Sequence, residues 1–233
     1  MCGRYRLKNP KAAFDWLEVA PSFDFAPRFN IAPTQRVPAM PCLGRIEEMS
    51  WGIVPAWAKK PSEILINARR ETIRGKRSFS DAFTRRRCLV PADGFYEWSK
   101  SGKRPYFFAM KGEAPFVFGG IWEESGETHR CCLITTIANA LLEPIHTRMP
   151  VIVRREDWPV WLDAEALSDA DFDRITAPFA REMSAVEVPA LVNSAAVDDP
   201  RCCEPAAPGA PPPKLKIARK PPLPPDPQQS FGF

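Results

Sequence analysis

The sequence predicts an α+β fold: a single domain with a mixed, mostly antiparallel, barrel-like β-sheet core and short peripheral helices. Many short runs rich in β-branched and aromatic residues have the pattern of strands, whereas segments with helical periodicity are few and short. Many short strands with a few helices around them indicate an α+β arrangement. With 233 residues, of which 45% are hydrophobic, the chain is long enough to bury a sizeable core.

The expected elements follow the chain in order. An amphipathic helix is expected over residues 10–19, where Phe14 and Leu17 share one face. Residues 99–103 have turn chemistry, so the strands on either side should form a hairpin. Ser168 or Asp169 is the expected N-cap of the last helix. Strands are predicted at residues 46–53, 88–90, 95–98, 105–110, 116–122, 130–137, 151–153 and 186–191, and helices at residues 80–86, 156–162 and 169–179.

The composition changes near residue 199. Eleven of the last 34 residues are proline, and such a segment cannot bury enough apolar surface to fold. We therefore expect one domain over residues 1–198 and an extended or disordered basic tail over residues 199–233, in which Cys202 and Cys203 would lie. The last six residues, from Gln228 to Phe233, resemble the short peptides that dock on sliding clamps, so a clamp is a candidate partner.

The sequence argues against several classes of protein. No run approaches the roughly 18 apolar residues of a membrane span, and the N-terminus lacks the apolar stretch of a signal peptide. We expect a cytoplasmic protein, nucleoid-associated in a bacterium, that has no membrane partner and acts as a monomer. The seven cysteines form no C-x-x-C pair and are accompanied by only two histidines, so neither a metal site nor a disulfide framework is expected.

Positive charge is concentrated in one segment. The net charge of +4 is too small to indicate a nucleic-acid partner by itself. Between Arg69 and Arg87, eight basic residues accompany only Glu71 and Asp81. Such a stretch is more often a solvated face than a binding site, but this one borders the motif at residues 66–72, which favours nucleic-acid binding. The eight basic residues are Arg69, Arg70, Arg74, Lys76, Arg77, Arg85, Arg86 and Arg87.

Cys2 has a chemically special position. Methionine aminopeptidase removes Met1 when the next side chain is small, and the product would carry an α-amine and a thiol on one residue. Because the pKa of an α-amine is about 7.7–8.0, much of it is unprotonated near pH 7 and can attack an aldehyde. The thiol can then add to the imine and close a five-membered thiazolidine ring. Alone, a cysteine at position 2 is weak support, since chance supplies many.

Further motifs follow in a fixed order along the chain. Together with MCGRY at residues 1–5, they resemble the SOS-response-associated peptidase (SRAP) family, whose members process abasic sites in single-stranded DNA. The resemblance covers about residues 2–195. The motifs are NIAPT (30–34), WGIVPAWA (51–58), INARRET (66–72), RRCLVPADGFYEW (86–98), ITT (134–136), Asn139 and IHTRMPV (145–151).

The resemblance implies a role for each matching residue. Cys2 would be the covalent nucleophile, and Asn67 would hold Cys2 and the opened sugar. Glu97 would lie beside the reacting carbon and His146 beside the sugar oxygens, where both could transfer the protons of ring opening and imine formation. No metal or organic cofactor is implied. The residues expected to contact DNA are Arg4, Trp51, Trp57, Arg69, Arg74, Arg77 and Arg148.

Each residue also has a plain structural interpretation. Glu97 could be an ordinary strand residue, His146 a hydrogen-bonded structural residue, and the tryptophans core residues. A covalent sensor of abasic sites could also show weak lyase and crosslink-reversal activity. Two other functions compete with it. One is a cysteine peptidase, including self-processing, built from Cys2, His146 and Asn67; the other is a non-covalent single-stranded DNA-binding adaptor.

Overall fold

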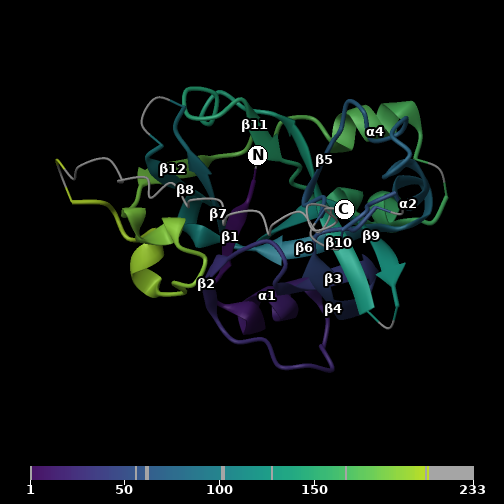
Figure 1. The fold of residues 1–233 in the computed structure, drawn as a ribbon, viewed down its shortest axis with the longest axis horizontal. Helices are drawn as coiled ribbons and strands as arrows, with labels where there is room; N and C mark the ends of the chain where they lie inside the picture. The colour runs from purple at the N-terminus through teal and green to yellow at the C-terminus, as the bar shows by residue number, and fades with distance from the viewer. Residues whose placement is uncertain are drawn as a thin grey trace, which may run out of the picture.

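A closed five-stranded barrel forms the centre of the fold (Figure 1). The computed structural model describes residues 2–55, 57–60, 63–100, 103–126, 128–165, 167–207 and 209. Strand β4 pairs in parallel with β10, whereas the other neighbours in the barrel are antiparallel. The expected mixed, mostly antiparallel, barrel-like core is therefore confirmed. The barrel strands, in spatial order, are β4 (Arg45–Trp51), β3 (Arg36–Cys42), β6 (Arg87–Ala92), β9 (Phe116–Ser125) and β10 (Thr128–Ile137).

Two short strands pair with the far end of β10. Strand β5 (Asn67–Arg69) lies parallel to it, with Asn67 opposite Leu133. Strand β11 (Arg148–Pro150) lies antiparallel to it, with Arg148 opposite Ile137. The two strands bring residues that are 81 positions apart, Asn67 and Arg148, to the same end of one barrel strand.

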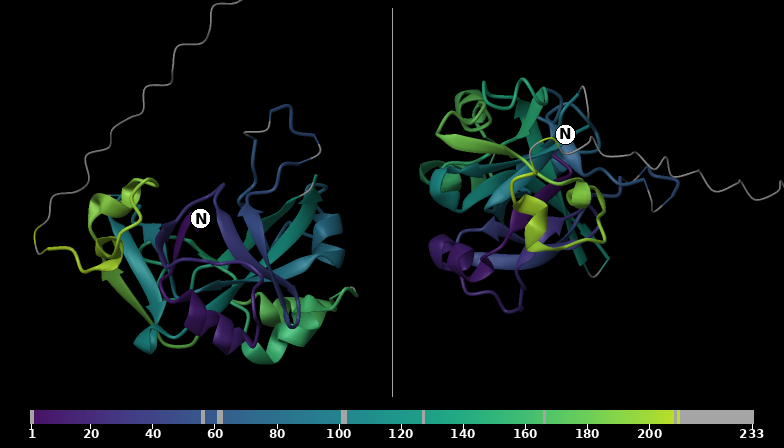
Figure 2. Two further views of the ribbon diagram at one scale, coloured as in Figure 1. Left: turned by 90° about the horizontal axis from the view of Figure 1, so that it is seen from below. Right: turned by 90° about the vertical axis from the view of Figure 1, so that its left-hand side faces the viewer.

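A second sheet of five antiparallel strands packs beside the barrel. Its first strand along the chain, β1, is held against the barrel because Tyr5 packs edge-on against Trp51 and Phe118, at ring-centroid distances of 5.5 and 5.6 Å. Figure 2 shows the start of the chain lying between the two sheets. The strands, in spatial order, are β12 (Met183–Glu187), β8 (Pro105–Met110), β7 (Gly94–Trp98), β1 (Arg4–Leu7) and β2 (Arg28–Ile31).

The chain passes from the barrel to the second sheet at Asp93, between β6 and β7. Asp93 accepts a hydrogen bond from the guanidinium of Arg6 at 2.5 Å, and both side chains are buried. The next residue, Gly94, has no space for a side chain, because a Cβ atom there would clash with the ring of Phe107. A buried ion pair and close packing at Gly94 thus lie where the chain passes from one sheet to the other.

Four short α-helices lie at the periphery: α1 (Pro10–Leu17), α2 (Ser80–Arg85), α3 (Trp158–Leu162) and α4 (Asp169–Ile175). Helix α1 buries Phe14 and Leu17, as expected. Ser168 caps α4 by accepting from the backbone N–H of Asp171, which confirms the expected N-cap. Helix α4 ends at Ile175 rather than at residue 179, because the residue before Pro178 is disfavoured in a helical conformation.

Two expected strands are wrong in position. A strand was expected at residues 151–153, but the strand observed there, β11, covers Arg148–Pro150. Of the expected residues, Ile152 forms only an isolated bridge to Phe118. The strand expected at residues 186–191 is observed three residues earlier, as β12 over Met183–Glu187. Pro189 then precedes a 3-10 turn over Ala190–Asn193. Helix α3 likewise begins with a 3-10 turn over Arg155–Asp157.

The expected domain boundary at residue 198 falls inside packed structure. A 3-10 turn at Pro200–Cys203 buries Cys202 completely beside Val188 and Val192, and the N–H of Ala206 donates to a carbonyl of β12. Cys202 is therefore a core residue and not part of a tail. The clamp-like segment from Gln228 to Phe233 lies outside the described residues and stays a prediction. None of the described helices has the length and apolar character needed to cross a bilayer.

Candidate active site at the start of the chain

Cys2 lies at the junction of the two sheets, where it is fully buried. It precedes β1, whose register against β7 places Arg4 opposite Tyr96 and so brings the start of the chain beside Glu97. From the barrel side, the amide of Asn67 donates from Nδ2 to the carbonyl of Cys2 at 2.7 Å. Two strands from distant parts of the sequence therefore hold Cys2 from opposite sides.

Glu97 and His146 lie together beside this cysteine. His146 Nδ1 is 3.9 Å from Glu97 Oε1. Glu97 is only 2% exposed, and burial raises its pKa from 4.5 to about 7. Burial lowers the pKa of His146, so its imidazole is largely neutral at pH 7. Near neutral pH the pair thus combines a carboxyl group that can donate or accept a proton with an imidazole that can accept one.

Asn67 offers one further polar group to the site. Its Nδ2 is used on the carbonyl of Cys2, but its Oδ1 is buried and has no hydrogen-bond partner among the described residues. A buried acceptor without a partner is unfavourable, so this oxygen is poised to accept a hydrogen bond from a group in the site. An amine on Cys2 would be such a donor.

The thiol of Cys2 is in its protonated form. Its Sγ lies 3.8 Å from the carbonyl oxygen of Arg4, and burial, followed by the charge of Glu97, raises its pKa well above the ordinary value. The nucleophile of a cysteine peptidase needs a lowered thiol pKa. The environment of Cys2 is therefore the opposite of the one that a thiol peptidase requires.

Trp51 does not have the role expected from the sequence. Its side chain is 1% exposed, so its ring cannot stack on a DNA base. Its indole Nε1 donates to the carbonyl of Ile66 at 3.0 Å, immediately before Asn67. Trp51 is a core residue that supports the strand carrying Asn67.

Arg148 and Arg4 are both engaged with protein acceptors. Arg148 donates to the two carboxylate oxygens of Glu71 at 2.6 and 2.9 Å and to the carbonyl of Thr135 at 2.6 Å. Arg4 donates to Asn30 Oδ1 at 2.9 Å and to the carbonyl of Val192 at 2.6 Å. A phosphate at either residue would have to replace one of these partners, so DNA contact there stays a prediction.

Sequence reasoning missed the partners of these arginines. Glu71 belongs to the INARRET motif, and this position was the only feature of the sequence that pointed to Glu71 as a functional residue. Asn30 belongs to NIAPT; it is fully buried, and its Nδ2 donates to the carbonyls of Val192, Ser194 and Val197. The NIAPT motif therefore holds the last packed segment of the chain against the sheet that carries Arg4.

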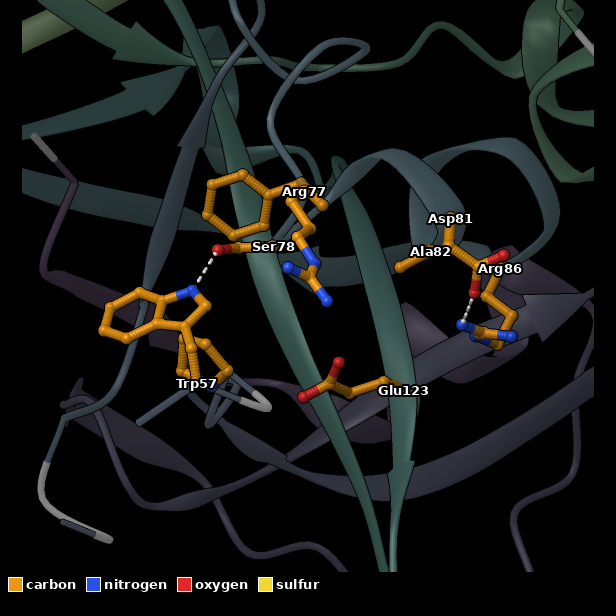
Figure 3. A pocket seen from close by; sticks show the side chains of 9 residues that line it. Trp57, Arg77, Ser78, Asp81, Ala82, Arg86 and Glu123 are labelled. Carbon is orange, nitrogen blue, oxygen red and sulfur yellow. Dashed lines mark hydrogen bonds and ion pairs between the residues drawn. The ribbon is translucent and has the colours of Figure 1, made fainter. Parts of the chain in front are cut away.

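The remaining residues expected to contact DNA divide into two groups. Arg69 and Arg77 are exposed, and neither side chain forms an ion pair with another described residue. Trp57 is 58% exposed, and its Nε1 donates to Ser78 Oγ at 2.8 Å (Figure 3). Arg74 instead pairs with Asp169 and lies over the ring of Phe172, 4.3 Å from its centroid. A ligand could therefore contact the side chains of Arg69, Arg77 and Trp57. Arg74 instead connects its loop to α4.

The chain is similar to a set of known proteins. The family model described as "SOS response associated peptidase (SRAP)" matches residues 1–195. The abasic site processing protein YoqW of Bacillus subtilis is 34% identical over 222 residues, covering 88% of this chain and 99% of that protein. The abasic site processing protein YedK of Escherichia coli is 29% identical over 181 residues, covering 71% and 81%. A crystal structure of a protein from Bacteroides thetaiotaomicron superposes with a TM-score of 0.77 at 25% identity, covering 88% of this chain and all of the other.

Proposed function

Because this chain belongs to the SOS response associated peptidase family, we propose that it processes abasic sites in single-stranded DNA by bonding to them covalently through Cys2. Its relatives carry names that describe abasic site processing. The observation that carries the proposal is the arrangement around Cys2: the amide of Asn67 lies 2.7 Å from its carbonyl, and the Glu97–His146 pair lies beside it. Removal of Met1 would create the reactive amine at this position.

The reaction proceeds without an oxidant or cofactor. The ring-opened sugar of an abasic site carries an aldehyde at C1′, which the α-amine of Cys2 attacks to give a carbinolamine. Loss of water gives an imine, and the thiol then adds to the imine carbon while its proton passes to the nitrogen. The product is a thiazolidine that joins the protein to DNA, and one water molecule is released overall.

The surrounding groups suit the proton transfers. Glu97, with a pKa of about 7, can donate a proton to the hydroxyl group that departs as water from the carbinolamine. His146 can accept the hydroxyl proton of the closed sugar and so favour ring opening. Asn67 Oδ1 can accept from the amine and orient its lone pair. Each such positioned acid or base group typically increases the reaction rate by about 10²–10⁴-fold.

The intermediate would also permit two weaker activities. The imine can lose the 3′ phosphate by β-elimination, which would give lyase activity. Hydrolysis of the closed ring, assisted by Glu97 and His146, would reverse the crosslink slowly. The exposed Arg69, Arg77 and Trp57 supply phosphate and base contacts along the strand, without requiring a particular sequence at the abasic site itself.

Denaturing gel electrophoresis tests the proposal. Protein whose Met1 removal has been verified by mass spectrometry is mixed with single-stranded DNA that carries one abasic site, and a heat-stable shifted band is expected. Absence of that band would refute covalent capture. Cys2→Ser should lose the stable product yet remain trappable by borohydride, because its amine persists. The matched control Cys42→Ser, which changes an exposed thiol, should leave the band unchanged.

If the protein were a cysteine peptidase, peptide cleavage would be expected in place of a DNA adduct. Cleavage of casein or of the chain itself would have to depend on Cys2, with no adduct to abasic DNA. A non-covalent adaptor would shift the strand on a native gel but not on a denaturing one. Blocking Met1 removal separates these cases, since it should abolish the covalent product while leaving non-covalent binding in place.

A further inference from the structure

A hollow of about 280 Å³ lies on the surface beside Trp57, away from the groups around Cys2 (Figure 3). It is formed by the loop after β4, the segment that leads into α2, and the end of β9. Trp57 borders one side, and the side chains of Arg77 and Glu123 point into the hollow from different elements. The hollow therefore combines an aromatic face, a donor and an acceptor.

Two charged residues of this hollow, Arg77 and Glu123, are not paired with its other described lining residues. Neither Arg77 nor Glu123 forms a side-chain hydrogen bond or ion pair with another of the residues that line it (Figure 3). Glu123 is only partly exposed, and burial raises the pKa of its carboxyl group, against the opposing effect of Arg86 and Arg130. By contrast, Arg86 on the far side pairs with Asp81. Arg77 and Glu123 are thus available to a ligand that carries both acceptors and donors.

The aromatic side of the hollow is held in position. The hydrogen bond from Trp57 Nε1 to Ser78 Oγ, at 2.8 Å, fixes the indole although the ring is 58% exposed. A fixed aromatic surface loses little freedom when a base stacks on it, which favours binding. A hollow of about 280 Å³ has room for one planar nucleobase.

The hollow lies within reach of a strand bound at Cys2. Glu123 pairs with Arg130 on β10, and Asn67 pairs with Leu133, three residues further along the same strand on its other edge. A rise of about 3.3 Å per residue and strand spacings of about 4.8 Å separate the Cα atoms of Glu123 and Asn67 by about 14 Å. That distance corresponds to a few nucleotides of a single strand.

We propose that this hollow binds an unstacked guanine base a few nucleotides from the abasic site, so that the protein prefers particular sequences around the damage. The inference rests on the proposed function for its choice of a single DNA strand. Guanine fits because its N1–H and N2–H donors face the two oxygens of a carboxylate such as Glu123. Its O6 and N7 acceptors match an arginine such as Arg77. Thymine and cytosine offer a carboxylate only one donor group, and adenine lacks the O6 acceptor.

Binding of a non-reactive strand tests the guanine site separately from the chemistry. Oligothymidylates that carry one tetrahydrofuran abasic analogue, with a single guanine moved through each flanking position, are titrated by fluorescence anisotropy. We expect guanine at one position to tighten the dissociation constant about five- to tenfold relative to thymine. Inosine, which lacks the 2-amino group, should lose most of this gain. Equal dissociation constants for all strands would overturn the proposal.

Protein variants assign the preference to the hollow. Glu123→Gln should reduce the guanine preference to less than about twofold, because an amide cannot accept from two donors. Trp57→Ala should weaken binding of every strand by about tenfold. The matched control Glu124→Gln changes the exposed neighbour on the opposite face of β9 and should behave as the wild type. A guanine preference that survives Glu123→Gln would also overturn the proposal.

The reactive strands distinguish the two proposals. If natural abasic strands form crosslinks at equal rates and the analogue strands bind equally in every context, the covalent function stands and the guanine site is refuted. If the analogue strands show the guanine preference but no natural strand forms a crosslink, the guanine site stands and the covalent function is refuted.

Discussion

Replacing Glu97 with glutamine should make the folded protein more stable and its reaction slower. Glu97 is 2% exposed, and its pKa rises from 4.5 to about 7 on folding. Between these values the folded chain holds a proton that the unfolded chain has released, so stability falls as the pH rises through this window. Above pH 7 the ionised carboxylate destabilises the fold by about 3 kcal/mol, which glutamine avoids because it carries no charge.

Urea unfolding at two pH values measures this effect. At pH 8 the free energy of unfolding of Glu97→Gln should exceed that of the wild type by about 3 kcal/mol, and at pH 5 by less than about 1 kcal/mol. Glu124→Gln, at an exposed position of β9, should show no such pH dependence. A variant that is less stable than the wild type at pH 8, or equally shifted at both pH values, would refute a buried carboxylate that ionises near pH 7.

The rate of crosslinking should respond in the opposite direction. The reaction needs an unprotonated amine, with a pKa of about 7.8, and a protonated Glu97, so the wild-type rate should peak near pH 7.4 and fall about sixfold by pH 6 and about ninefold by pH 9. Glu97→Gln should react at least about 100-fold more slowly and lose the fall on the alkaline side. An unchanged alkaline fall would show that another group supplies the proton.

Three further substitutions test the surroundings of the site. Asn67→Ala should slow crosslinking at least about tenfold while leaving affinity for a non-reactive abasic analogue nearly unchanged; equal losses of rate and affinity would mean that Asn67 binds DNA and does not position Cys2. Asp93→Ala leaves Arg6 buried without its closest carboxylate and should lower the free energy of unfolding by about 3–5 kcal/mol; a loss below about 1 kcal/mol in urea unfolding would contradict the buried pair. Trp51→Phe removes an indole donor and should lower stability by about 1–2 kcal/mol without weakening binding of undamaged single strands; weaker binding would restore Trp51 as a DNA contact.

The sequence predicted the continuously apolar strands well, and it missed strands that contain proline or have very few residues. Continuous apolar runs identified β8, β9 and β10 because burial on both faces leaves an unmistakable pattern. Strand β3 was missed because Pro38 and Pro41 lie inside it, and proline usually argues against a strand. Strand β5 has three residues, Asn67–Arg69, too few to show any period. Its existence depends on β10, whose paired residues lie 66 positions further along the chain.

The candidate site was identified by chemistry and resemblance rather than by pattern. The position of Cys2 suggested an amine and a thiol together, and the family motifs supplied Asn67, Glu97 and His146. Local sequence does not distinguish Trp51 from Trp57, although one is 1% and the other 58% exposed, because exposure is decided by tertiary packing. For the same reason Cys202, in a proline-rich context, was assigned to a tail although it is buried.

The burial of Cys2 also has a consequence for the biosynthesis of the protein. Strand β1 forms hydrogen bonds only with β2 and β7 among the described strands, and β7 ends at Trp98. The start of the chain therefore stays unpaired on one edge until the ribosome has made about 98 residues, which takes roughly 5–20 s. Under the proposed function, that interval would give an aminopeptidase its least hindered access to the start of the chain, because β1 is not yet paired with β7. We therefore expect the yield of crosslinking protein to depend on how early Met1 is removed during translation.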